Sequence, residues 1–357
     1  MTPFRYEHAR DVADAIARVG RTENAQFIAG GTSQVDLLKE GVQRPGTLVD
    51  IFRIGLNQIT DTESGGLSIG ANVRNSVASD HPVIRKRYTA ISEALHAGAS
   101  QQIRNMASMA GNLLQRTRCP YLRDPAQSCN KRDPGTGCAA VQGFNRLHAI
   151  FGQTDEGPQS PRTCIAVHPS DLAVAMAALE AVIVVESASG ERRIAFEHLH
   201  RLPGDDPSRD TNLAPDDLIV AIELPALHGR SHYLKVRDRA SYAYALVSCA
   251  TAVEMDGDRI AKARIALGSV AHKPWRLPAA EALLVGEQPS VDLFRRAAAA
   301  GLEGACTYLM NGYKPDLARV LIARGLAETT GLEPLQGAAG TAFAASVGGI
   351  AGVHEVA

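Results

Sequence analysis

The clearest local pattern in the sequence is Phe27-Ile28-Ala29-Gly30-Gly31-Thr32-Ser33-Gln34, in which an apolar run leads into two glycines and two hydroxyl residues. The apolar residues 27–29 predict a short strand and residues 35–39 predict a helix, so the two glycines occupy a strand-to-helix turn. At such a turn, backbone N–H groups can approach a diphosphate closely, and hydroxyls and the helix N-terminus add favourable dipoles. The pattern is not the G-x-G-x-x-G of a Rossmann site, and a tight turn that needs glycine for a positive φ is the alternative. Taken alone, the stretch leaves both interpretations open.

Two later segments have a similar character. The first runs from Gln102-Ile103-Arg104-Asn105 to Ala110-Gly111-Asn112-Leu113-Leu114 and offers a small residue, a glycine and an amide in succession. The second, His168-Pro169-Ser170-Asp171, places a hydroxyl and a carboxylate at the start of a helix. Each segment is also explained as a turn or a helix cap. In this order and spacing, the three segments are informative together.

The 357 residues are enough for two or three domains of mixed helix and strand. In the first part, strands are predicted at 47–51, 67–71, 182–185 and 218–224, and helices at 88–99 and 172–181. Residues 225–231 resemble a linker. Beyond it, strands at 245–253 and 260–267 flank the turn Asp256-Gly257-Asp258, and helices are predicted at 279–284, 291–300 and 316–327. The sequence therefore predicts an α+β fold with a smaller sheet-plus-helix domain at its C-terminal end.

Composition limits the choice of partners. A formal net charge of −1 with 21% charged residues gives no global attraction to nucleic acid or to an anionic membrane. No stretch approaches the roughly 20 strongly apolar residues of a membrane span, and Gly337 to Val353 is so rich in Gly and Ala that a flexible or docking tail is expected. The first 20 residues show neither a signal peptide nor a twin-arginine motif. The chain is thus expected to stay in the cytoplasm unless a partner with a signal carries it to the periplasm.

The six cysteines are unevenly distributed. Cys119, Cys129, Cys138 and Cys164 lie in or next to the stretch 116–164, which lacks periodicity and is rich in Pro and Gly. A loop of this length is usually functional or is held by something other than a core. The spacing of the four cysteines is not the tight pattern of ferredoxins. It is compatible with an iron–sulfur cluster, a zinc site or two disulfides. The remaining thiols, Cys249 in a predicted strand and Cys306 in a predicted helix, are expected to be buried in cores.

The chain resembles the FAD-binding subunits of the xanthine dehydrogenase and aldehyde oxidase family of molybdenum hydroxylases, over about residues 1–328. It is especially similar to the flavin subunits of bacterial periplasmic aldehyde oxidoreductases. The segments that carry the resemblance are 27–32, 69–71, 102–105, 110–113, 169–172 and 268–276. The resemblance implies an FAD-binding domain of the PCMH or vanillyl-alcohol oxidase type, with two α+β subdomains, over residues 1–226. It also implies a C-terminal domain of the CO dehydrogenase flavoprotein type over residues 231–328, followed by the tail 329–357.

The same resemblance implies roles for single residues. The stretch from Ala29 to Gln34 would wrap the FAD diphosphate, and the stretch from Ala110 to Leu114 would approach the flavin side. Asp171 would bind the cofactor at a third position. Lys235 and an aliphatic residue near Ile219 or Val220 would complete the site, with Val220 preferred. No catalytic acid, base or nucleophile is expected.

The resemblance also bears on the thiols, because similar aldehyde oxidoreductases and 4-hydroxybenzoyl-CoA reductases carry a 4Fe-4S cluster in this subunit. It implies that Cys119, Cys129, Cys138 and Cys164 bind one such cluster. An oxidised cluster with four thiolates has a net charge of about −2 and favours nearby cations and N–H donors. The loop supplies five Arg and Lys residues between positions 116 and 132, against Asp124 and Asp133.

The implied function is electron transfer within an oxidoreductase of three different subunits. A large subunit with molybdopterin would oxidise an aldehyde, a small subunit with 2Fe-2S clusters would relay the electrons, and this chain would pass them through FAD to an external acceptor. One alternative is the beta subunit of an enzyme like 4-hydroxybenzoyl-CoA reductase. Another, from a different class, is a cluster-stabilised binding subunit with a vestigial flavin site.

Overall fold

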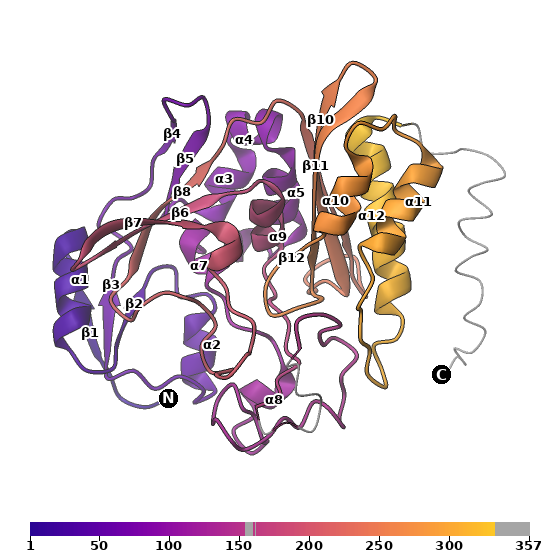
Figure 1. Ribbon diagram of the computed structural model, residues 1–357. Coiled ribbons are helices and arrows are strands. Elements are labelled where there is room, and N and C mark those ends of the chain that lie inside the picture. Colours follow the sequence, from indigo (N-terminus) through magenta and orange to yellow (C-terminus); the bar gives the residue numbers. More distant parts are fainter. Residues whose placement is uncertain (154–159, 161, 333–357) are drawn as a thin grey trace.

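A parallel sheet of three strands presents the Gly30-Gly31 turn at the carboxyl end of its strand β2. This computed structural model describes residues 1–153, 160 and 162–332, and Figure 1 shows this sheet beside α1. The strand order is β1-β3-β2, and helices connect strands that run in the same direction, as parallel pairing requires. Its elements are β1 (Arg5–His8), α1 (Val12–Arg21), β2 (Ala25–Ile28), α2 (Gln34–Lys39) and β3 (Thr47–Asp50).

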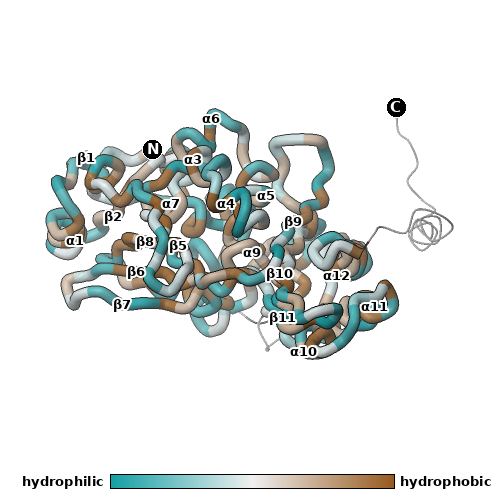
Figure 2. The backbone as a smooth tube through the Cα atoms, turned by 90° about the horizontal axis from the view of Figure 1, so that it is seen from above, coloured by the Kyte–Doolittle hydropathy of each residue, from teal (hydrophilic) through white to brown (hydrophobic). Residues whose placement is uncertain are grey.

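An antiparallel sheet of order β4-β5-β8-β6-β7 completes the part of the chain before residue 225. Its strands are β4 (Ile59–Asp61), β5 (Leu67–Gly70), β6 (Val182–Ser187), β7 (Gly190–Ala195) and β8 (Leu218–Leu224). The edge strand β7 is hydrophilic along most of its length, as Figure 2 shows in teal, and five of its six residues are exposed. Charged residues on an edge discourage pairing with a second sheet.

Helices fill the space beside this sheet. They are α3 (Asn75–Asp80), α4 (Pro82–Arg87), α5 (Thr89–Ala97), α6 (Gln101–Arg104), α7 (Met109–Leu113) and α9 (Asp171–Ala178), with the short 3-10 helix η1 (Phe196–His198). In α9 every residue after Asp171 is buried, because the helix packs between α5 and the strands of the C-terminal sheet. The hydroxyl of Ser170 caps α9 by accepting a hydrogen bond from Ala173 N (3.0 Å). The predicted cap is confirmed, and the helix ends three residues earlier than predicted.

The C-terminal part is an antiparallel sheet of order β12-β11-β10-β9 that is covered by helices on one side (Figure 1). Its elements are β9 (Arg230–Val236), β10 (Val247–Asp256), β11 (Arg259–Gly268), β12 (Trp275–Arg276), α10 (Pro278–Leu284), α11 (Val291–Ala300) and α12 (Lys314–Thr330). Ser231, predicted to end a linker, is instead buried within β9. Trp275 stacks on Phe151 with ring centroids 5.1 Å apart, which packs the cysteine-bearing stretch against this part.

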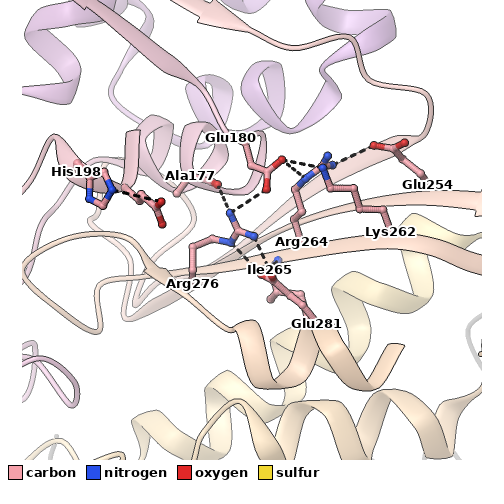
Figure 3. A network of polar contacts seen from close by, with 10 residues as sticks. Ala177, Glu180, His198, Glu254, Lys262, Arg264, Ile265, Arg276 and Glu281 are labelled. Atoms are coloured by element: carbon pink, nitrogen blue, oxygen red, sulfur yellow. Dashed lines mark hydrogen bonds and ion pairs between the residues drawn. The ribbon is translucent and has the colours of Figure 1, made fainter. Parts of the chain in front are cut away.

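An ion-pair network joins the end of α9 to the C-terminal sheet (Figure 3). Glu180 pairs with Lys262 (3.0 Å) and Arg264 (2.6 Å) of β11. Arg276 of β12 donates to the carbonyl of Ala177 (3.1 Å) and pairs with Glu281 of α10 (2.8 Å). Because Arg264 is almost completely buried, these contacts fix how the two parts sit against each other.

The cysteine-bearing stretch lies at the bottom of the view in Figure 1, and α8 (Pro120–Arg123) is its helix in the described residues. Polar contacts hold it on both sides, since Arg123 pairs with Glu40 next to α2 (2.9 Å) and Asn311 donates to the carbonyl of His148 (3.2 Å). Residues 154–159 and 161 of the predicted loop, and 333–357 of the predicted tail, lie outside the described residues. Cys249 is buried in β10 as predicted, but the prediction for Cys306 was wrong, because this thiol is exposed between α11 and α12.

Candidate functional site

A cleft of about 720 Å³ opens between the Gly30-Gly31 turn and the segment 107–116. The two walls touch backbone to backbone, because a Cβ on Gly30 would lie 1.9 Å from the carbonyl oxygen of Met106. Gly31 has φ +69°, so the turn also uses the left-handed region that favours glycine. Gly31 is therefore required by the turn itself and Gly30 by the close approach of the second loop, and together they bring the two loops to one cleft.

The first turn of α2 offers unused hydrogen-bond donors to this cleft. Within the described part of the chain, the N–H groups of Thr32, Ser33 and Gln34 donate to no backbone or side-chain acceptor. All three residues line the cleft. Free N–H groups at the start of a helix favour an anionic group such as a phosphate.

A second cleft of about 380 Å³ continues from the first. Five residues line both clefts, and they are Thr32, Ser33, Ala107, Gly111 and Gln115. The second cleft reaches Asn112 and then Asp171 and Lys235. Two joined clefts with phosphate donors at their junction have the shape that an extended dinucleotide needs.

Asp171 and Lys235 form a buried pair in the second cleft. Lys235 Nζ lies 2.7 Å from Asp171 Oδ2, and the hydroxyl of Tyr233 donates to the same carboxylate. Burial raises the pKa of Asp171, whereas Lys235 and Tyr233 favour its ionised form. The amide oxygen of Asn112 accepts from the hydroxyl of Ser170 (2.7 Å), which ties the second Gly-containing segment to the helix that carries Asp171.

The structure brings together nearly all residues predicted for the cofactor. The first cleft is lined by Ala29, Gly30, Gly31, Thr32, Ser33, Gln34, Ala110, Gly111 and Leu114. Asn112, Asp171 and Lys235 line the second. Ile219 lines the first cleft, while the preferred Val220 packs in a buried apolar cluster with Ile16 and Ile51. The sequence did not point to Asp210, which also lines the first cleft, because it lies in an irregular segment without a motif.

The four cysteines of the loop are close enough to interact electrostatically. Cys129 and Cys138 face each other across an isolated antiparallel bridge. Burial raises the pKa of Cys119 to about 12, and negative charge on Cys129 or Cys138 would raise it further. Burial likewise raises the pKa of Cys164 to about 12, with smaller contributions from Cys138 and Cys119. The four thiols therefore form one group, which we call the thiol group.

Backbone N–H groups surround this thiol group. They hydrogen-bond to the sulfurs and oppose the effect of burial on the pKa values. The donors are Leu122 and Tyr121 for Cys119, Ala140, Ile165 and Val141 for Cys138, and Ala166 for Cys164. His148 Nε2 lies 3.2 Å from the sulfur of Cys119. Such donors stabilise thiolates, which is the form that binds metals.

No described helix is long and apolar enough to cross a membrane. No described set of three or more His, Cys, Asp or Glu side chains has an arrangement that marks a metal-ion site.

Comparison with known families identifies the class of protein. Residues 2–227 match the FAD binding domain in molybdopterin dehydrogenase, and residues 232–329 match the CO dehydrogenase flavoprotein C-terminal domain. The chain belongs to this family of flavoprotein subunits, which confirms the predicted fold class and the prediction that it is an FAD-binding component of an oxidoreductase.

Three individual proteins show how far the similarity extends along the chain. The chain is 46% identical over 331 residues to the aldehyde oxidoreductase FAD-binding subunit PaoB of Escherichia coli strain K12, covering 92% of this chain and 98% of that protein. It is 26% identical to the glyceraldehyde dehydrogenase medium chain of Sulfolobus acidocaldarius, covering 82% and 84%. The fold matches carbon monoxide dehydrogenase from Hydrogenophaga pseudoflava with a TM-score of 0.70 at 23% identity, covering 92% of this chain and 98% of that one.

Proposed function

We propose that this chain is the electron-transfer subunit of a molybdenum-dependent aldehyde oxidoreductase with three different subunits. It would receive electrons from a molybdopterin-containing large subunit through a small subunit with 2Fe-2S clusters, and deliver them to an external acceptor. The observation that carries the proposal is the similarity to PaoB along nearly the whole chain, together with a cleft of the right shape for FAD. Export together with a signal-bearing partner is part of the proposal.

The joined clefts would hold FAD in an extended conformation. The free N–H groups of Thr32, Ser33 and Gln34 would bind its diphosphate, and Lys235 and Asp171 would contact it in the second cleft. FAD supplies the redox chemistry, since it can take up electrons singly and release them in pairs. The residues of this chain bind the cofactor, orient it and set its electrostatic surroundings.

The thiol group would bind one 4Fe-4S cluster through Cys119, Cys129, Cys138 and Cys164. Three features support a cluster of net negative charge, namely the proximity of the four thiols, the N–H donors around them and the buried cation of Lys131, which favours the ionised form of Cys164. Metal–thiolate bonds would also stabilise a stretch with little regular structure, as metal sites do in other small loop-rich regions.

Replacement of Cys129 with serine tests the cluster. We expect the Cys129→Ser variant, purified anaerobically, to lose iron, acid-labile sulfide and the broad visible absorption of the cluster while it keeps at least part of its FAD. Its stretch 116–164 should also become sensitive to protease. Cys306→Ser is the matched control, because this thiol is exposed and should be dispensable for iron binding. Zinc in place of iron in the wild-type protein, or full iron content in Cys129→Ser, would contradict the assignment.

Flavin analysis and activity measurements test the electron-transfer role. We expect about one FAD per chain, released by acid precipitation because no segment clearly presents a His or Cys for covalent attachment. A purified chain without flavin would favour a binding subunit with a vestigial site. The chain alone should not oxidise aldehydes, whereas the complex purified with its partners should. Aldehyde turnover by the single chain would contradict an electron-transfer role.

A further inference from the structure

A buried polar region separates the first cleft from the thiol group, and we call it the partition. It surrounds a small cavity of about 20 Å³, which is room for about one water molecule. Gln115 and Asp210 line both this cavity and the first cleft. Lys131 and Ala166 line the cavity on the side of the thiols, where Ala166 N–H points to Cys164. The partition therefore contacts both candidate cofactor regions.

Asp210 stands at the centre of the partition and holds a cation on either side. Its Oδ2 lies 2.6 Å from Arg116 Nε, and Arg116 lines the first cleft. Its Oδ1 lies 2.6 Å from Lys131 Nζ, which also donates to the carbonyl of Pro207 (2.8 Å). Although burial favours the neutral acid, Lys131 and Arg116 hold the pKa of Asp210 well below its usual range. One carboxylate thus links a cation at the cleft to a cation at the thiols.

Two histidines border the same cavity and lack partners for buried nitrogens. His272 is 7% exposed, and neither of its ring nitrogens has a hydrogen-bond partner in the described structure. His200 donates from Nε2 to the carbonyl of Leu113 (2.8 Å), and its Nδ1 is unpartnered. Burial lowers the pKa values of both, so neither carries a charge near neutral pH. A water in the cavity would satisfy these nitrogens, and the charges of the partition are those of Arg116, Asp210 and Lys131.

We propose that Asp210, with Arg116 and Lys131, couples the FAD cleft to the thiol group electrostatically, so that one carboxylate sets the reduction potentials of both cofactors. Asp210 is a positioning residue in this scheme, because it holds one cation against each region. The inference rests on the proposed function, which supplies FAD and the 4Fe-4S cluster.

The signs of the expected effects follow from charge. Reduction adds negative charge at either cofactor, so a nearby cation raises its potential and a nearby anion lowers it. Asp210→Asn removes the anion and leaves Arg116 and Lys131 uncompensated, so both potentials should rise. Lys131→Met removes the cation on the thiol side, so the potential of the cluster should fall and that of the flavin should change less. Lys131→Arg keeps the charge and should remain close to wild type.

The test is a potentiometric titration of the anaerobically purified full-length chain, with the cluster followed by electron paramagnetic resonance and the flavin by visible absorption. Iron, sulfide and flavin contents are measured first. Asp205→Asn is the matched control, because Asp205 lies in the same segment with a side chain that is 81% exposed. We expect potentials equal to wild type for Asp205→Asn, and shifts of opposite sign at the cluster for Asp210→Asn and Lys131→Met.

The possible outcomes separate this inference from the proposed function. A wild-type chain without iron would overturn the cluster and the coupling together. Iron and flavin contents equal to wild type, with unchanged potentials in Asp210→Asn and Lys131→Met, would overturn the coupling alone. If Asp210→Asn fails to take up iron, the coupling is tested by comparing Lys131→Met with Lys131→Arg. Equal cluster potentials in those two variants would also overturn the coupling.

Discussion

Replacing Gly30 with alanine should separate the two loops that form the first cleft. The added Cβ would lie 1.9 Å from the carbonyl oxygen of Met106 and 2.7 Å from its carbonyl carbon. To reach even 3.0 Å from that oxygen, the loops must move apart by about 1.1 Å (3.0 − 1.9), and the obstructing atoms belong to the backbone. Overpacking of this kind costs roughly 1–3 kcal/mol.

The consequence should be visible both in stability and in FAD binding. In a domain of this size, that cost corresponds to a fall in Tm of roughly 2–4 °C for each kcal/mol. Displacing the N–H donors of Thr32 to Gln34 by about 1 Å should weaken FAD binding roughly tenfold to hundredfold. Thermal unfolding of the apoprotein and fluorescence titration with FAD measure the two effects.

Gly20 provides the matched control for this substitution. It lies within α1, and a Cβ there would meet no atom within 4 Å. Gly20→Ala should therefore leave FAD binding unchanged and stabilise the chain by roughly 0.5–1 kcal/mol through helix propensity. A Gly30→Ala apoprotein with the Tm of wild type and an unchanged Kd for FAD would refute the close contact of the two loops.

Four further substitutions probe charged pairs of the structure. Hydrogen bonding to Glu93 raises the pKa of His232 above its usual value, so its stabilising effect is fully present below about pH 6.5 and is lost as the pH rises through the folded-state pKa. The difference in Tm between wild type and His232→Gln should accordingly shrink from pH 5 to pH 9, and a constant difference would contradict this. Asp171→Asn leaves Lys235 buried without its counter-charge and should cost about 3–5 kcal/mol, whereas Asp171→Asn combined with Lys235→Met should cost less than the sum of the two single variants in urea unfolding. Glu180→Gln weakens the network between the two parts, and because its side chain is 39% exposed, the same assay should show a loss of about 1 kcal/mol or less.

Local patterns predicted those elements whose signals lie within a few residues. The predicted strand 218–224 and the predicted helix 291–300 have the same bounds as β8 and α11. Their ends were predictable because the apolar run of a strand and the N-cap and periodicity of an amphipathic helix mark the ends within the local sequence. The turn at Gly31 was predictable for the same reason, since its positive φ requires glycine locally, whereas Gly30 is required by a contact with the distant Met106. The cofactor residues of the first cleft were predicted from the family resemblance, because the turn alone leaves its role open.

Long-range contacts were not predictable in this way. Lys131 and Asp210 are 79 positions apart, and neither belongs to a pattern that indicates the other. Cys306 was wrongly placed in a helix, because the apolar pattern of α11 ends at Ala300 and the following segment is held by single contacts such as Cys306 N to the carbonyl of Ile150 (2.8 Å). Only tertiary structure creates such pairs, so only the structure shows them.

The thiol-bearing stretch is built into the FAD-binding domain and is not an appended module. The carbonyl of Leu113 contacts the Nε2 atoms of both His168 (3.1 Å) and His200 (2.8 Å), so the chain is fixed as it leaves the wall of the cleft. Arg116 is then held by Asp210, and Cys119 follows three residues later. Buried polar contacts of this kind tolerate little displacement, since a lost partner leaves a buried polar group unsatisfied. A change in the thiol group is consequently expected to reach the wall of the FAD cleft, so a substitution in one region should have a smaller but measurable effect in the other.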